Sequence, residues 1–189
     1  KKETVFTGRF YRITVLSERL VRLEYNTSGI FNDDLTLLVN NRNFPMPHFK
    51  IEEDEKYLVI TTNYFMMQYV KEKPFKGPVF APDSNLKVKL SGTDKLWYFN
   101  HPEARNFKST STSLDGYPQI KMEKGLYSTD GFASIDDTNS ININKEGLLQ
   151  KSNNNGLDIY LFIYRRDFGF CLKDYFTLTG YPILLPRYA

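Results

Sequence analysis

The segment from residue 157 to residue 164 limits the possible folds more than any other part of the chain. Aliphatic and aromatic side chains alternate along it, in the order Leu157, Ile159, Tyr160, Leu161, Phe162, Ile163 and Tyr164. An extended strand with this pattern is hydrophobic on both faces. Such a strand has to lie in the middle of a sheet and be covered on both sides. The sequence therefore predicts a layered domain around this strand.

Most of the remaining chain shows the two-residue period of short antiparallel strands. The runs 11–15 and 21–25 alternate in this way around a tight connection at residues 17–19, which predicts a hairpin. Further strands are expected at 35–39, 57–62, 64–70, 86–90 and 96–99, and shorter ones around 120, 133–135 and 141–143.

Only one segment has the periodicity of a helix. Cys171 and Tyr175 lie at helical spacing between Asp167, a candidate N-cap, and Gly180, which suits the left-handed position after a helix. We expect this helix near residues 168–179. Many short strands followed by one helix indicate an all-β protein, namely an antiparallel two-sheet β-sandwich with one C-terminal helix.

Composition excludes several classes of function. The length of 189 residues suits one domain. The formal net charge is +3 and the basic residues form no stripe, so nucleic acid is not expected as a partner. No apolar run is long enough for a membrane helix, so a membrane is not expected either. Cys171 is the single cysteine, which excludes an internal disulfide and favours a cytoplasmic location. Because it lies in an apolar stretch, we expect its thiol to be buried and inert. His48 and His101 are expected in solvated loops, and no metal site or cofactor is expected.

The candidate binding residues are carboxylates that stand beside glycines and aromatic residues. Asp115 closes a long polar stretch from 101 to 116, and Asp130 lies in a second acidic segment, 125–137. Carboxylate oxygens accept hydrogen bonds from sugar hydroxyls, and aromatic rings cover the C–H faces of sugars. Asp-Gly is also an ordinary turn sequence, so the residues alone leave a binding role and a turn role open.

Several motifs in a fixed order carry a family resemblance. They are Arg12-Ile13-Thr14-Val15 with Leu20 to Tyr25, Trp97-Tyr98, Asn106-Phe107-Lys108-Ser109-Thr110, Leu114-Asp115-Gly116, Gly125 to Asp137, and Asp174-Tyr175 through Leu185-Pro186-Arg187-Tyr188-Ala189. Together they resemble the N-terminal region of glycoside hydrolase family 31, the retaining α-glucosidase and α-xylosidase family. The resemblance spans nearly the whole chain, although Phe132 stands where relatives usually carry Trp and Ser109 where they carry Gly.

The resemblance implies a domain organisation and a role. Residues 1–166 would form an N-terminal, galactose-mutarotase-like β-sandwich, and residues 167–189 would be a helix and linker that lead into a (β/α)₈ catalytic barrel. The parent would be a retaining α-glucosidase-type hydrolase acting on an α-glucoside or oligosaccharide. Both catalytic carboxylates would lie on the barrel. No residue of this chain is therefore assigned a catalytic role, and the chain alone is expected to be inactive.

The resemblance also implies roles for individual acidic residues. A loop of the family's N-terminal sandwich reaches over the barrel mouth, and an Asp on that loop helps to bind the substrate. By motif order this residue corresponds to Asp115, with Asp130 as the second choice. Asp136 and Asp137 are expected to hold turns together. The surface that meets the barrel is expected to include exposed apolar residues from the set Phe132, Leu184, Leu185 and Tyr188.

Two other functions are compatible with the sequence. A free-standing carbohydrate-binding module would have the same sandwich and the same sugar-facing residues. An aldose epimerase would share the mutarotase-like fold but needs a His and a Glu placed as acid and base. Continuation of the reading frame into a barrel would separate the first alternative from a hydrolase domain.

Overall fold

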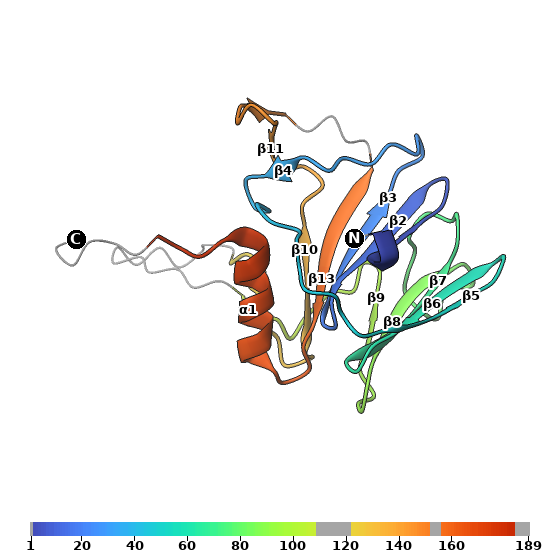
Figure 1. Cartoon of the computed structure of the whole chain (residues 1–189). Helices are drawn as coiled ribbons and strands as arrows, with labels where there is room; N and C mark the ends of the chain where they lie inside the picture. The colour runs from blue at the N-terminus through green and yellow to red at the C-terminus, as the bar shows by residue number, and fades with distance from the viewer. Residues whose placement is uncertain (1, 109–121, 152–155, 184–189) are drawn as a thin grey trace.

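The computed structural model describes residues 2–108, 122–151 and 156–183, and these residues form three layers (Figure 1). Helix α1 covers one face of a five-stranded sheet, and a second five-stranded sheet lies against the other face. Every strand pairing is antiparallel. The predicted all-β sandwich with one C-terminal helix is confirmed.

The strands fall into two large sheets and one small one. The first sheet has the order β1-β2-β3-β13-β10: Val5–Thr7, Tyr11–Ser17, Leu20–Tyr25, Leu157–Ile163 and Phe132–Asp136. The second has the order β5-β6-β7-β8-β9: Lys50–Glu53, Tyr57–Thr61, Phe65–Val70, Leu86–Leu90 and Leu96–Tyr98. The small sheet has the order β12-β11-β4: Leu149–Gln150, Asn142–Ile143 and Leu35–Thr36. A 3₁₀ turn, Lys2–Thr4, precedes β1.

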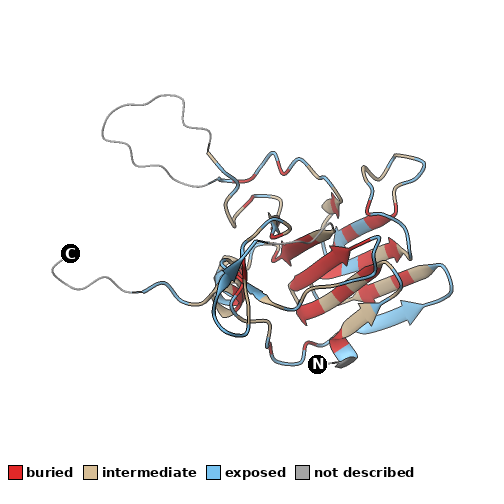
Figure 2. Ribbon diagram, turned by 90° about the horizontal axis from the view of Figure 1, so that it is seen from above, coloured by how far each residue is buried: buried red, intermediate tan, exposed pale blue. Residues whose placement is uncertain are grey.

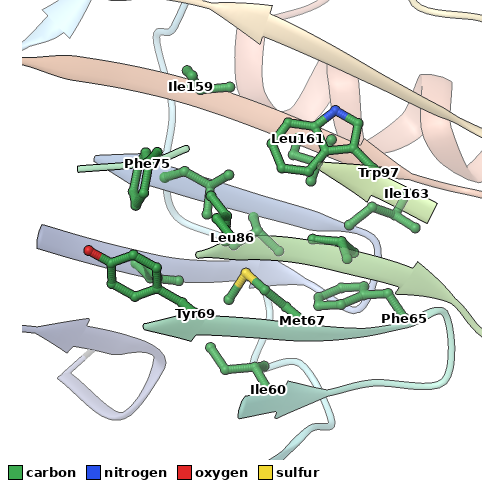
Figure 3. Close-up of a cluster of buried hydrophobic side chains, with 14 of the residues drawn as sticks. Ile60, Phe65, Met67, Tyr69, Phe75, Leu86, Trp97, Ile159, Leu161 and Ile163 are labelled. Atoms are coloured by element: carbon green, nitrogen blue, oxygen red, sulfur yellow. The ribbon is translucent and has the colours of Figure 1, made fainter. Parts of the chain in front are cut away.

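Strand β13 lies inside the first sheet, between β3 and β10, as its sequence requires. Its aliphatic face, with Ile159, Leu161 and Ile163, joins an inner core between the two large sheets (Figure 3). Its aromatic face, with Tyr160 and Phe162, joins an outer core beneath helix α1. The buried residues accordingly concentrate in the strands of the two facing sheets (Figure 2). The prediction of a central strand covered on both sides is confirmed.

Helix α1 spans Phe168–Thr179, the range expected from the sequence. The thiol of Cys171 is fully buried in the outer core, and burial raises its pKa, so it is inert as expected. Gly180 has a φ of 86° and donates its N–H to the carbonyl of Phe176. Asp167 is the N-cap residue, as expected, but its carboxylate makes no capping bond and instead accepts a hydrogen bond from the Tyr64 hydroxyl at 2.8 Å. No helix in the described part of the chain is long and apolar enough to cross a membrane.

Some strands differ from the sequence-based expectation. The apolar run 35–39 contributes only the two residues of β4, because Val39 turns into the outer core beside the helix. Strands β1, β5 and β12 were not expected, since they are short or, in β5, exposed at every position. The strand expected around residue 120 lies outside the described residues. The boundary between residues 1–166 and 167–189 stays a prediction, and α1 packs into the same outer core as the sheet.

A buried ion-pair ladder occupies the outer face of the first sheet beyond the helix. Arg12 donates to Glu24 at 2.6 and 2.8 Å, and Arg22 donates to Asp158 at 2.9 and 2.6 Å. Arg22 Nη2 also lies 3.2 Å from Glu24 Oε1, so the four groups join β2, β3 and β13. Burial raises the pKa of Glu24. The ladder provides polar partners at the end of the sheet that α1 does not cover.

Removing one member of the ladder should cost more than an ordinary surface substitution. In Asp158→Ala the Arg22 guanidinium, whose side chain is only 4% exposed, loses its bidentate partner. Breaking a buried pair in this way costs about 3–5 kcal/mol. We expect that loss in the free energy of unfolding measured with urea, whereas Asp94→Ala at an exposed position should leave the midpoint unchanged. A loss below about 1 kcal/mol, typical of an exposed pair, would show that water solvates Arg22 after the substitution.

Candidate functional site

The first candidate residue, Asp115, lies outside the described residues, as do Leu184, Leu185 and Tyr188. The structure does describe both flanks of the polar stretch that contains Asp115, residues 101–108 and 122–131. These flanks and the strand ends beneath them form the candidate site considered below.

The two flanks are held together by the side chain of Asn106. Its amide nitrogen donates to the carbonyl of Gly125 at 2.8 Å, and its amide oxygen accepts the N–H of Gly125 at 2.9 Å. The backbone adds a bond from the N–H of Phe107 to the carbonyl of Tyr127 at 2.8 Å and an isolated bridge between Asn106 and Ser128. The first residue of the motif at 106–110 is therefore a clamp that joins the flanks side by side.

The backbone of the first flank is unusual. Asn100, Glu103 and Lys108 all have positive φ angles, between 48° and 64°. Non-glycine residues rarely adopt this conformation, and where they do the strain is frequently associated with functional segments. Three of the five non-glycine residues with positive φ in the described part of the chain thus lie in or next to this flank, which makes it a candidate functional segment.

The second candidate residue, Asp130, is held by basic side chains. Its carboxylate lies 2.6 Å from Lys95 Nζ and 3.6 Å from Arg105 Nη1, and its side chain is 11% exposed. A sugar hydroxyl at this carboxylate would have to share it with Lys95. The geometry therefore gives Asp130 a clear structural role, and a role in substrate binding stays a prediction.

The glycine after Asp130 is required by its position. Gly131 has a φ of 81°, and a Cβ built there would lie 2.5 Å from the carbonyl oxygen of Arg165 and 2.6 Å from its Cα. Its carbonyl accepts the N–H groups of both Tyr164 and Arg165 at 2.9 and 2.8 Å. The Asp-Gly pair is thus a turn that pins the second flank to the end of β13.

A buried polar cluster beneath the flanks was not anticipated from the sequence. Glu103 accepts hydrogen bonds from the backbone N–H and the hydroxyl of Ser134, and its second oxygen is buried without a hydrogen bond, 3.6 Å from Lys124 Nζ. His101 accepts the Glu103 N–H on Nδ1 at 3.0 Å and packs edge-on against Phe132 at 5.0 Å. Nothing in a polar stretch without periodicity signals that its Glu turns inward.

One expectation is wrong at this cluster, and one of the four candidates for an exposed apolar surface is excluded. His101 is half-buried rather than solvated, and its burial lowers its pKa, so the ring is neutral at pH 7. Phe132 is 1% exposed in the inner core, so it does not contribute to an exposed apolar surface. His48, by contrast, is 92% exposed as expected.

The cluster does bring a His and a Glu together, which is the pairing that an epimerase needs. However, the Glu103 side chain has no exposed surface and both of its oxygens face protein groups. A sugar cannot reach this carboxylate in the observed conformation. The geometry therefore does not favour epimerase chemistry.

Of the remaining acidic residues, Asp136 holds a turn as expected, because it accepts the N–H of Thr138 at 3.0 Å. Asp137 joins a turn through its carbonyl, which accepts the N–H of Ser140 at 3.1 Å, but its carboxylate accepts the hydroxyl of Thr36 in β4 at 3.0 and 3.2 Å and so links distant segments. Trp97, from the Trp-Tyr motif, lies in the inner core (Figure 3). Within the described ranges, no group of three or more His, Cys, Asp or Glu residues is arranged to hold a metal ion.

Comparison with known proteins identifies the fold. The sequence matches no family model and is not significantly similar to any curated protein. Among solved structures, a mutant of a glycoside hydrolase family 31 dextranase from Flavobacterium johnsoniae, complexed with isomaltotriose, matches 97% of this chain with a TM-score of 0.50 at 13% identity. A second structure of that dextranase, complexed with glucose, matches 97% of this chain with a TM-score of 0.48 at 12% identity.

The likeness concerns a part of the dextranase, because this chain spans 28% of the length of that enzyme. At 13% identity the likeness shows a shared fold. The fold of this chain is therefore similar to a domain-sized portion of a family 31 glycoside hydrolase.

Substitution of Gly131 tests whether the turn at Asp130-Gly131 packs tightly against the Arg165 backbone. Gly131→Ala should destabilise the protein, because the positive φ costs about 1–3 kcal/mol and the new Cβ collides with the Arg165 backbone. Gly147→Ala is the matched control, because Gly147 has a φ of 79° and nothing within 4 Å of the built Cβ. We expect Gly131→Ala to lower the free energy of unfolding more than Gly147→Ala does. Equal losses for the two variants would show that a Cβ at position 131 does not collide with the Arg165 backbone.

Proposed function

We propose that this chain is the N-terminal β-sandwich domain of a retaining, α-glucosidase-type glycoside hydrolase. Residues 1–166 form the sandwich, and residues 167–189 lead into a (β/α)₈ barrel that carries both catalytic carboxylates. The domain packs on that barrel and supplies the loop with Asp115 to the substrate-binding site. The substrate is an α-glucoside or an oligosaccharide, and the chain itself requires no cofactor.

Two observations carry this proposal, the fold match and the order of the motifs. The fold matches a domain-sized part of a family 31 hydrolase over 97% of this chain, and the motifs that resemble that family occur here in the family's order. The site geometry supports the loop assignment, because Asn106 and Gly131, both from these motifs, secure the two flanks of the segment that contains Asp115.

Exposed apolar side chains support docking to a large partner. The small sheet and its adjoining turns present Leu35, Leu37, Ile141, Leu148 and Leu149, each between 39% and 62% exposed. A backbone hydrogen bond from Leu37 to Ile141 holds two of the segments side by side. Exposed apolar side chains gathered on paired segments favour an interaction site. We assign this surface to the barrel.

A free-standing carbohydrate-binding module is the second candidate. A cavity of about 570 Å³ on the outer side of the second sheet is lined by Tyr57 and by Pro74 and Pro82. The Tyr57 ring and the two prolines are suited to the C–H face of a sugar, although Lys56 Nζ lies 5.0 Å from the centre of that ring. A parent protein without a barrel, together with oligosaccharide binding at Tyr57, would favour this function over the hydrolase domain.

Activity measurements on the chain and its parent test the main proposal. The purified 189-residue chain should not release the phenol from an aryl α-glucoside, whereas the full-length parent should. A retaining hydrolase needs two carboxyl groups about 5 Å apart, and the proposal places both on the barrel. Turnover that follows the chain through purification and disappears when one of its own acidic residues is substituted would contradict the proposal.

Substitution of Asp115 in the full-length parent tests the loop. A charge-assisted hydrogen bond to a sugar hydroxyl contributes about 1.5–3 kcal/mol, so Asp115→Ala should lower kcat/KM by about 10- to 150-fold with little change in Tm. Asp94→Ala, at an exposed position of another loop, should change neither quantity.

Measurements of kcat/KM and Tm on Asp130→Ala distinguish a structural role of Asp130 from a role in substrate binding. Asp130→Ala should lower Tm, because Lys95 loses its partner. An unchanged kcat/KM with a lowered Tm for Asp115→Ala would make it a turn residue and would move the binding role to Asp130.

A further inference from the structure

A cavity of about 250 Å³ opens on the outer face of the first sheet, away from the candidate site described above. It lies between β2, the N-terminal turn and residues 42–47. Polar and apolar side chains line it in similar proportion, and Val15, Phe44, Pro45 and Pro47 are among the apolar ones. Its polar lining is dominated by three arginines, Arg12, Arg22 and Arg42.

The three arginines do not have equal numbers of carboxylate partners. Arg12 and Arg22 are paired within the ladder to Glu24 and Asp158. Arg42 has no ion pair with any described residue, and it donates instead to the Tyr160 hydroxyl at 2.7 Å and to two backbone carbonyls. Its Nη2 atom is buried without a hydrogen bond. A guanidinium in the lining that has no carboxylate partner favours an anion in this cavity.

One surface carboxylate already shows how an anion fits here. Asp33 places Oδ1 2.7 Å from Arg12 Nη2 and 3.7 Å from Arg22 Nη1. Its side chain is nevertheless 77% exposed, so it reaches these buried guanidinium groups from outside. The arginines hold the pKa of Asp33 below its ordinary value despite the opposing effect of desolvation. An exposed ion pair is weak, so another carboxylate can replace Asp33 at little cost.

We propose that this cavity binds a monosaccharide-sized organic carboxylate, whose carboxylate displaces Asp33 from Arg12 and Arg22 and also meets Arg42. The apolar part of the lining receives the carbon face of the ligand, and Thr14 also lines the cavity. The volume lies below the usual range of roughly 300–1,000 Å³ for ligand pockets, which suits one sugar acid rather than an oligosaccharide. The site is independent of the proposed hydrolase function.

Calorimetric titration of the 189-residue chain tests the proposal with three probes. Sodium glucuronate should bind, whereas glucose, which matches it in size without the charge, should not. Inorganic phosphate should bind more weakly than glucuronate, because the position held by Asp33 is that of a planar carboxylate. Equal responses to glucuronate and glucose, no response to glucuronate, or stronger binding of phosphate would each overturn the proposal.

Variants then assign the binding to this cavity. Asp33→Asn should tighten glucuronate binding by up to about fivefold, the factor that corresponds to removal of an exposed ion pair. Glu55→Gln makes the same change in net charge at an exposed position of the other sheet and should leave the affinity unchanged. If Asp33→Asn behaves like Glu55→Gln, Asp33 does not occupy the anion position and the proposal fails.

Arg42→Lys keeps the charge but removes the buried Nη2 donor, and it should weaken glucuronate binding about tenfold or more. Should that variant fail to fold, Thr14→Val changes the cavity lining at nearly constant volume and should also weaken binding. Wild-type affinity in folded Arg42→Lys or, failing that, in Thr14→Val would place the carboxylate elsewhere.

Discussion

Burial of both faces of β13 is the constraint from which the other layers follow. The face with Ile159, Leu161 and Ile163 requires an apolar partner, which the second sheet supplies through the inner core. The opposite face carries Tyr160 and Phe162, and it requires a second cover. Helix α1 is that cover, and its buried residues enter the outer core directly. Because apolar burial contributes in proportion to area, a strand buried on two sides binds three layers into one unit.

The elements that the sequence predicted well are those whose own pattern determines their burial. The hairpin of β2 and β3, the central strand and helix α1 each carry a clear period, and they match the structure closely. Strand β5 could not be found in this way, because all four of its residues are exposed and only backbone pairing with β6 defines it. The run 35–39 was misjudged for a different reason, since Leu38 and Val39 pack into the outer core whereas Leu35 and Leu37 are exposed. A local sequence pattern therefore predicts a strand or helix whose burial follows a regular period. It does not predict an element that is defined by its contacts with distant segments.

The candidate site shows the same division. The glycine of the Asp-Gly pair could be predicted as a turn, and Gly131 is one, but its contact with the Arg165 backbone depends on how distant segments meet. The clamp made by Asn106 could be located only as a motif residue, because its partner is nineteen residues away. Glu103 gave no signal at all. A charged residue in a polar stretch is ordinarily exposed, and the hydrogen bonds from Ser134 in β10, together with Lys124 nearby, make its burial acceptable.

The ion-pair ladder resolves an ambiguity that the central strand creates. A strand that is apolar on both faces specifies its register weakly, because a slip by one residue still buries hydrophobic side chains. Asp158 removes this freedom. In the observed register it faces the ladder and binds Arg22, and it pairs across the sheet with Glu24. A slip by one residue would turn Asp158 into the inner core and leave Arg22 buried without its partner, at a cost of several kcal/mol. The same polar end of the sheet leaves arginine donors beside a cavity, so the interaction that fixes the strand also creates the chemistry of the proposed carboxylate site.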